Sequence, residues 1–195
     1  FGWFVSCFNL VLLLVFWFGG GFPLLDRWVR DFEFGPIISG LIFIGVLSTV
    51  KGILSLPFNL YHTFGIEARF GFNKTTFATY VLDILKGLVL AIVLGMPLLA
   101  AILAFFQYAG PHAWWVCWIG ITIYMLLVQF IAPAWIMPLF NKFTPLDDGE
   151  LKAAILAYAR GIEFPLENVY QMDGSRRSTK SNAFFTGFGR NKRIV

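Results

Sequence analysis

The sequence predicts a mostly α-helical integral membrane protein with about four transmembrane helices and a more polar C-terminal part. Of the 195 residues, 58% are hydrophobic and only 13% are charged, whereas soluble domains carry about 25% charged residues. The mean hydropathy is +0.73. Residues 87–140 contain no Asp, Glu, Lys or Arg. This composition excludes an ordinary soluble domain.

Four apolar stretches are long enough to cross a bilayer, which takes about 20 residues in a helix. The glycine run 19–21 ends the first stretch. Pro133 and Pro138 are expected to kink or end the fourth, because proline removes a helical hydrogen bond. The predicted spans are residues 1–18, 37–60, 79–106 and 113–138.

The basic residues predict the orientation of these spans. Nine of the fifteen Lys and Arg residues lie in the tail, residues 141–195. The connection at 61–76 adds two more, whereas the connections on the opposite side carry only Arg27 and Arg30, offset by three acidic residues. The positive-inside rule therefore places 61–76 and 141–195 in the cytoplasm of a multi-pass protein.

The tail has the pattern of a small α+β unit. Asp147 and Glu150 form a candidate capping box, with Asp147 as the N-cap and Glu150 at N3. Apolar residues at helical spacing follow, and then short β-prone runs separated by turn residues. The tail is predicted to contain a helix at 148–160 and strands near 168–172, 183–186 and 192–195.

Few polar side chains interrupt the spans. Asp83 and Lys86 are three residues apart, so they share a helix face and can pair. Lys51 lies inside the second span, where an ammonium group must either reach the interface or face a watery cavity. Cys7 and Cys117 each sit in an apolar run and are expected to be small buried hydrophobes.

No metal or catalytic motif is complete in the chain. The cysteines and the two histidines, His62 and His112, do not have zinc-site spacing. His62 follows a span and is expected at the membrane interface. His112 lies in a turn on the opposite side.

The closing segment, residues 172–195, carries six Lys or Arg residues and one Asp. Its basic and aromatic residues faintly match an RNA-binding pattern, but a four-span membrane protein disfavours nucleic acid as a partner. A patch for anionic lipids and a simple solvated basic loop both stay open.

Three motifs then indicate a family: IEARFGFNKTT at 66–76, PLFNKFTPLDDGEL at 138–151 and MDGSRRSTKSNAFFTGFGRNKRIV at 172–195. Their order and spacing closely resemble the type-one CAAX prenyl proteases, which are integral-membrane zinc metalloproteases. The HtpX-type heat-shock proteases share the NAF-TG element, but the longer membrane half and the IEARFGFN connection resemble the CAAX group more.

The resemblance implies that the tail begins a cytoplasmic, zincin-like α+β protease domain. In this family a strand like KRIV leads into a helix bearing HExxH, with two His ligands and a Glu general base, and a third Glu ligand follows. None of these is in the chain. We therefore expect an N-terminal part of a longer enzyme. It would have no catalytic residue or metal ligand of its own and be inactive alone, with zinc bound only in the intact protein.

The resemblance also implies a substrate-binding strand edge at Asn182, Ala183 and Phe184, where a peptide would add as a further strand. The alternative is that 183–186 is only an apolar strand packed on the helix at 148–160.

The polar residues of the 61–76 connection have two interpretations. They either form a network that docks the cytoplasmic part or belong to a solvated loop. The residues concerned are Glu67, Arg69, Asn73 and Lys74.

The expected function is cleavage near the C-terminus of CAAX-type or other membrane-associated substrates by a zinc metalloendopeptidase. The expected partners are the lipid bilayer and a peptide or protein substrate, which is typically prenylated. Two alternatives are a non-catalytic membrane scaffold or adaptor, and a membrane-protein quality-control protease of the same fold.

Overall fold

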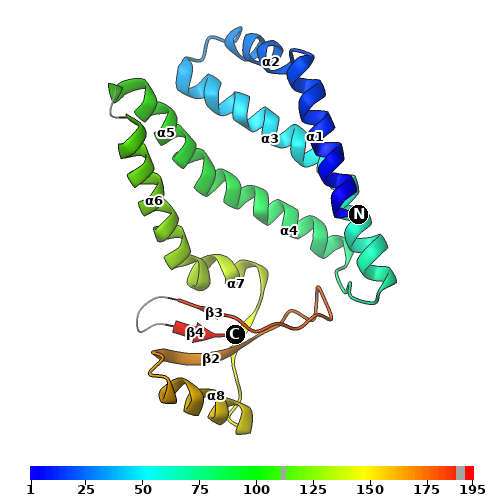
Figure 1. The fold of residues 1–195 in the computed structure, drawn as a ribbon, viewed down its shortest axis with the longest axis vertical. Coiled ribbons are helices and arrows are strands. Elements are labelled where there is room, and N and C mark those ends of the chain that lie inside the picture. The colour runs from blue at the N-terminus through cyan, green and yellow to red at the C-terminus, as the bar shows by residue number, and fades with distance from the viewer. Residues whose placement is uncertain (111–112, 188–191) are drawn as a thin grey trace. The chain divides into compact units, whose positions relative to one another are not determined.

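The structure, a computed structural model, describes residues 1–110, 113–187 and 192–195. Long helices precede a small C-terminal sheet (Figure 1). Among the described residues, three helices are long and apolar enough to cross a membrane, or four if one bent pair is a single span. The predicted fold class, a mostly helical membrane protein ending in an α+β part, is confirmed.

Contacts divide the chain into two compact units. One combines Phe1–Ile66 with Leu90–Cys117, and the other combines Glu67–Val89 with Trp118–Val195. Each unit therefore joins segments that are far apart in sequence, and each is described here by itself.

The first unit begins with a bent helix pair. Helix α1, Gly2–Phe18, is followed by α2, Gly21–Arg30, at an angle of 62°. Gly20 makes the break, because its φ of 75° lies in the left-handed region that favours glycine. Helix α3, Pro36–Leu60, comes next. The connection after the first span is thus itself helical.

The three long spans are composite helices, each with a π-helical segment. Pro133, at the predicted kink, lies in one of these segments. Extra residues of this kind are common where proline interrupts a helix. The spans consist of α3 with η1 (Tyr61–Glu67), of α4 (Phe77–Leu90) with η2 (Ala91–Gly95) and α5 (Met96–Tyr108), and of α6 (Ala113–Ile131) with η4 (Ala132–Ile136) and α7 (Met137–Phe140).

Helices of the first unit are held by apolar contacts. The Phe8 ring of α1 lies 4.9 Å from the Phe58 ring of α3, measured between centroids. Helix α3 also packs on α5, where a Cβ added to Gly40 would come within 2.8 Å of Leu103 Cδ1. Glycine at this position lets the two helices approach closely.

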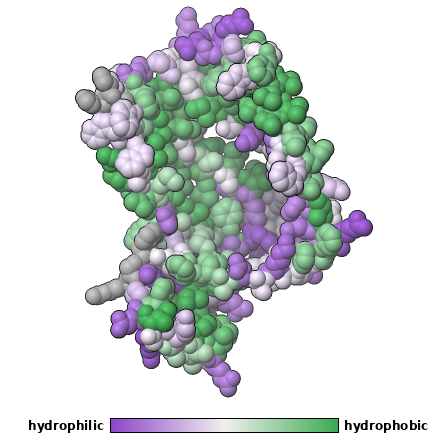
Figure 2. All heavy atoms as spheres, viewed as in Figure 1, coloured by the Kyte–Doolittle hydropathy of each residue, from purple (hydrophilic) through white to green (hydrophobic). Residues whose placement is uncertain are grey.

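Many large apolar side chains of the helices are exposed, and green, hydrophobic residues cover much of the helical part on the face drawn in Figure 2. Trp3, Phe18 and Trp135 are 89%, 82% and 76% exposed, which suits a lipid environment. Cys117 is buried as predicted, but Cys7 is exposed. The prediction for Cys7 was wrong, because no residue of α1 is buried within the protein.

The second unit contains a four-stranded sheet in the order β1-β2-β4-β3. β2 pairs with β1 antiparallel and with β4 parallel, and β3 pairs antiparallel with β4. Helix α8, Glu150–Gly161, packs on β2, where Ala159 and Val169 are buried. The strands are β1 Phe143–Pro145, β2 Leu166–Met172, β3 Phe185–Thr186 and β4 Lys192–Ile194.

The start of α8 differs from the expected capping box. The N-cap residue is Gly149, and no side chain caps the helix. Asp148 Oδ1 instead accepts a hydrogen bond from Lys152 Nζ at 2.8 Å. The helix begins at Glu150, so neither residue of the expected box stands at its required position, and the prediction was wrong.

Candidate functional site

Strand β3 is one of the two edge strands of the sheet among the described residues, and β1 is the other. Phe184 N–H donates to Val195 O at 3.0 Å, and Val195 N–H donates to Phe184 O at 2.9 Å. Hydrogen-bonded and non-hydrogen-bonded residues alternate along an antiparallel pair. The N–H and C=O of Phe185 therefore point away from β4, towards the open edge, where another strand could pair.

The three residues predicted to bind substrate all lie at the start of this edge. Asn182 and Ala183 are exposed, Phe184 is half-buried, and Asn182 Oδ1 accepts a hydrogen bond from Ala183 N–H at 2.9 Å. Their role in binding stays a prediction. Asn182 and Ala183 also line a cavity of about 800 Å³, whose lining includes Leu151 and Ile155.

One side of the edge strand is occupied by an aromatic contact. The ring of Phe185 meets that of Phe164 edge-on at 6.0 Å, just after the end of α8. Lys192 Nζ lies 4.4 Å from the centroid of Phe164, a cation–π geometry. Phe185 is nevertheless 68% exposed. The strand is supported without being buried.

The segment leading to this edge is held by Arg177. Its Nε donates to Asp83 Oδ2 at 2.8 Å, its Nη2 donates to Asp83 Oδ1 at 2.9 Å, and its Nη1 donates to Asn141 Oδ1 at 2.8 Å. The hydrogen bonds that Arg177 donates to Asp83 raise the pKa of Arg177. Lys86, the predicted partner of Asp83, instead donates to Leu139 O at 2.8 Å.

Residues 71–75 and 177–180 form what we call the docking contact. Lys74 N–H donates to Arg177 O at 3.0 Å, and Thr179 N–H donates to Phe72 O at 3.0 Å. Asn73 and Ser178 pair as an antiparallel bridge. Backbone bonds of this kind fix the register of the two segments.

The four polar residues of the 61–76 connection fall into two groups. Glu67 forms an ion pair with Lys180, with 3.1 Å between Oε1 and Nζ. Asn73 and Lys74 lie in the docking contact. Arg69 is exposed and has no recorded partner among the described residues. Glu67 thus contacts the tail through its side chain, whereas Asn73 and Lys74 contact it through their backbone.

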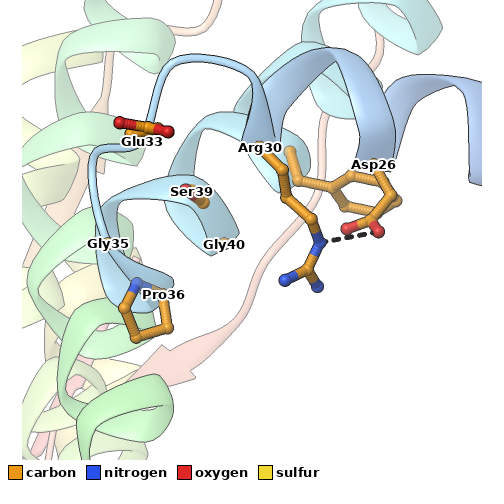
Figure 3. A pocket seen from close by; sticks show the side chains of 8 residues that line it. Asp26, Arg30, Glu33, Gly35, Pro36, Ser39 and Gly40 are labelled. Carbon is orange, nitrogen blue, oxygen red and sulfur yellow. Dashed lines mark hydrogen bonds and ion pairs between the residues drawn. The ribbon is translucent and has the colours of Figure 1, made fainter.

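A second hollow of about 480 Å³ lies where α2 turns into α3 (Figure 3). Arg30 Nε donates to Asp26 Oδ2 at 2.8 Å across its rim, and both side chains are well exposed. The lining holds two acidic residues, Asp26 and Glu33, and one basic residue, Arg30, which already pairs with Asp26. It is a weaker candidate than the β3 edge.

Lys51 lines a third cavity of about 430 Å³ together with Asn9, on α3 and α1. The rest of the lining is mainly apolar. The polar side chains of Lys51 and Asn9 thus line the same cavity. Lys51 itself is exposed.

The described residues do not fit a catalytic zinc ion. No three His, Cys, Asp or Glu residues among them lie close enough to hold a metal. His62 is exposed, with its ring 5.9 Å from that of Phe1, and His112 lies outside the described residues. No chemical step can be assigned to a metal on these residues.

Two family models match the chain. Residues 1–142 match the model described as CAAX prenyl protease N-terminal, five membrane helices, and residues 145–195 match peptidase family M48. The chain belongs to the CAAX prenyl proteases of peptidase family M48. This confirms the resemblance indicated by the three motifs. The five helices of the model compare with three or four candidate spans among the described residues of this family member.

Relatives of this CAAX protease chain come from distant eukaryotes. It is 45% identical over 180 residues to CAAX prenyl protease 1 homolog of Arabidopsis thaliana, which covers 92% of the chain and 42% of the relative. It is 37% identical over 195 residues to the Caenorhabditis elegans homolog, covering 100% of the chain and 43% of the relative. The chain therefore spans less than half the length of these relatives.

A solved structure agrees. The crystal structure of S. mikatae Ste24p matches with a TM-score of 0.90 and 37% identity, covering 98% of this chain and 46% of that one. The fold described above is thus that of S. mikatae Ste24p over nearly all of this chain.

Proposed function

We propose that this chain supplies the membrane helices and the substrate-binding strand edge of a zinc-dependent endopeptidase that cuts CAAX-type, prenylated substrates near their C-terminus. The observation that carries the proposal is the open edge of β3. The Phe185 N–H and C=O point outward, with Asn182 and Ala183 beside them. A peptide would add there as a strand, held by main-chain hydrogen bonds.

Zinc in this proposal is bound by residues of the full-length protein outside the described part of this chain. The chain alone is then inactive, because it holds the peptide without the group that cleaves it. Family membership supports this division of roles.

The docking contact supports the proposed orientation. Residues 71–75 and 177–180 are joined by backbone hydrogen bonds, so both segments lie on one side of the membrane. The excess of basic residues on that side favours the cytoplasm. We propose that 61–76 and 141–195 are cytoplasmic, where substrate C-termini would reach the β3 edge.

Peptide hydrolysis by the full-length protein tests the function. The purified, zinc-loaded protein is offered a farnesylated CAAX peptide and its unprenylated counterpart, and the products are identified by mass spectrometry. We expect release of the C-terminal fragment from the farnesylated peptide. Equal cleavage of both peptides would favour the quality-control alternative, and no cleavage of either would favour the scaffold.

A variant pair tests the edge itself. Phe185→Pro removes the outward N–H. It breaks no hydrogen bond to β4, because this N–H points away from β4, and proline is tolerated at strand edges. Phe185→Ala removes the ring and keeps the N–H. We expect the proline variant to lose about tenfold or more in kcat/KM, mainly through KM. A smaller loss than that of the alanine variant would contradict binding at this edge.

A further inference from the structure

The side chain of Arg177 connects three segments that are remote in sequence. It belongs to the loop between β2 and β3, whereas Asp83 belongs to α4 and Asn141 follows α7. Three hydrogen bonds of 2.8, 2.9 and 2.8 Å use Nε and both Nη atoms of one planar guanidinium group. Only arginine presents such a fork to a carboxylate.

The main chain of the same residue is also bound. Arg177 O accepts a hydrogen bond from Lys74 N–H at 3.0 Å and another from Thr75 Oγ1 at 3.2 Å. Side chain and backbone together leave this residue little freedom. Its side chain is 26% exposed and that of Asp83 is 25% exposed, so the ion pair is weakly screened by water.

This fixed point lies close to the open strand edge. Thr179, bonded to Phe72 O and Gly71 O, is three residues from Asn182, a reach of at most about 11 Å. At the far end, Phe184 is bonded to Val195. The exposed residues 181–183 therefore lie between two hydrogen-bonded residues, Thr179 and Phe184, and their position depends on both.

We propose that Arg177 is a positioning residue for the substrate edge. By binding Asp83 and Asn141, it holds residues 177–184 in the one placement in which β3 receives a peptide in a single register. The proposal rests on the proposed peptidase function, because the register matters only if a peptide adds to this edge. Arg177 acts through the segment and does not touch the substrate.

A strand register shifts in steps of two when side-chain faces are kept. A loosened edge therefore predicts a specific error, which is cleavage of a bond two residues away from the normal one. Loss of general stability would lower the amount of active protein and leave the cleaved bond unchanged. The cleavage position thus separates positioning from a merely structural role.

The experiment compares Arg177→Gln with Arg176→Gln in the full-length, zinc-loaded protein. The control removes the same charge from the neighbouring residue, which is exposed. The measurements are kcat, KM and the cleaved bond of a farnesylated peptide, and amide hydrogen exchange of Thr179 and Phe184. Size-exclusion elution shows that each variant is folded.

We expect Arg177→Gln to lose about tenfold or more in kcat/KM, to produce a second product cut two residues away, and to exchange both amides faster. Arg176→Gln should stay within about twofold of the unmodified protein in kcat/KM and in both amide exchange rates, and should give a single product. Arg177→Lys keeps the charge without the fork and should fall between them. Asn141→Ser, which removes only one of the three bonds, gives the same readout if Arg177→Gln does not fold.

A single product, with kcat/KM equal to that of Arg176→Gln, overturns the positioning role. If the unmodified protein cleaves no peptide, the proposed function fails by itself. Amide exchange then decides whether Arg177 holds the edge: faster exchange at Phe184 in Arg177→Gln supports it, and unchanged exchange overturns it.

Discussion

The helices of the first unit and the docking contact of the second are held together in different ways. Helices α1 and α3 touch through aromatic rings, and α3 and α5 touch through close approach at Gly40. The docking contact uses backbone hydrogen bonds, and an ion pair of Lys180 with Glu67 lies beside it. Packing in lipid tolerates small sliding movements, whereas directional bonds fix two segments in register. Precise positioning is thus concentrated where the proposed substrate edge begins.

The comparison predicts its largest effect at Arg177. Arg177→Ala leaves the carboxylate of Asp83 about three-quarters buried without its partner. We expect the free energy of unfolding to fall by about 2–3 kcal/mol, because an uncompensated buried charge is strongly destabilising. Thermal unfolding in detergent, followed by tryptophan fluorescence, measures it. Arg176→Ala should change stability by less than about 0.5 kcal/mol, and an equal loss in both variants would contradict the assignment.

An intermediate effect is expected at the helix contact of the first unit. Gly40→Val places atoms against Leu103 Cδ1, which already lies 2.8 Å from an added Cβ. Overpacking of this kind costs about 1–2 kcal/mol. The matched control is Gly45→Val, because nothing lies within 4 Å of a Cβ at Gly45. The same unfolding measurement compares them, and Leu103→Ala should restore part of the loss. If Gly45→Val were equally harmful, helix propensity and not packing would be the cause.

A smaller effect is expected at the ion pair beside the docking contact. Lys180 Nζ lies 3.1 Å from Glu67 Oε1 and 4.6 Å from the centroid of the Phe72 ring. Lys180 is 55% exposed, so Lys180→Gln should lower stability by only about 0.5–1 kcal/mol. A double-mutant cycle with Glu67→Gln measures the coupling. The coupling should shrink at about 1 M salt, and a salt-independent value would contradict a screened surface pair.

The smallest effect is expected at Asp148, which accepts a hydrogen bond from Lys152. That bond lowers the pKa of Asp148. A carboxyl group whose pKa is lowered by folding stabilises the fold above its ordinary pKa, and the stabilisation disappears as the pH falls through the lowered value. Asp148→Asn should therefore be slightly less stable than the unmodified protein at neutral pH and equal to it in strong acid. Melting temperatures across the acid range measure the difference in stability. A difference between the two proteins that grows as the pH falls would contradict the prediction.

The sequence alone predicted the features that depend on nearby residues. Uninterrupted apolar runs predicted the long helices, and glycine and proline marked the break after α1 and the π-helical segment at Pro133. Motif order gave the family. These signals are visible because hydrophobicity and turn chemistry act over a few residues.

The features that the sequence did not reveal are long-range pairings. Asp83 and Arg177 are 94 residues apart, so the local partner Lys86 was the only one that spacing could suggest. Strand β1 was missed because it has three residues and ends in Pro145. It forms only by pairing with β2. Tertiary contact, and not local preference, decides such elements.

The length of the spans has a consequence for the membrane. Helix α3 continues through η1 as 32 residues, Pro36–Glu67, which extends about 48 Å at 1.5 Å per residue. A hydrocarbon core of about 30 Å would need a tilt of roughly 50° to enclose it, beyond the usual range of tilt. Its ends therefore project into the headgroup layers. Lipids with longer acyl chains would cover more of the helix, so bilayer thickness sets how much of Tyr61–Glu67 meets water.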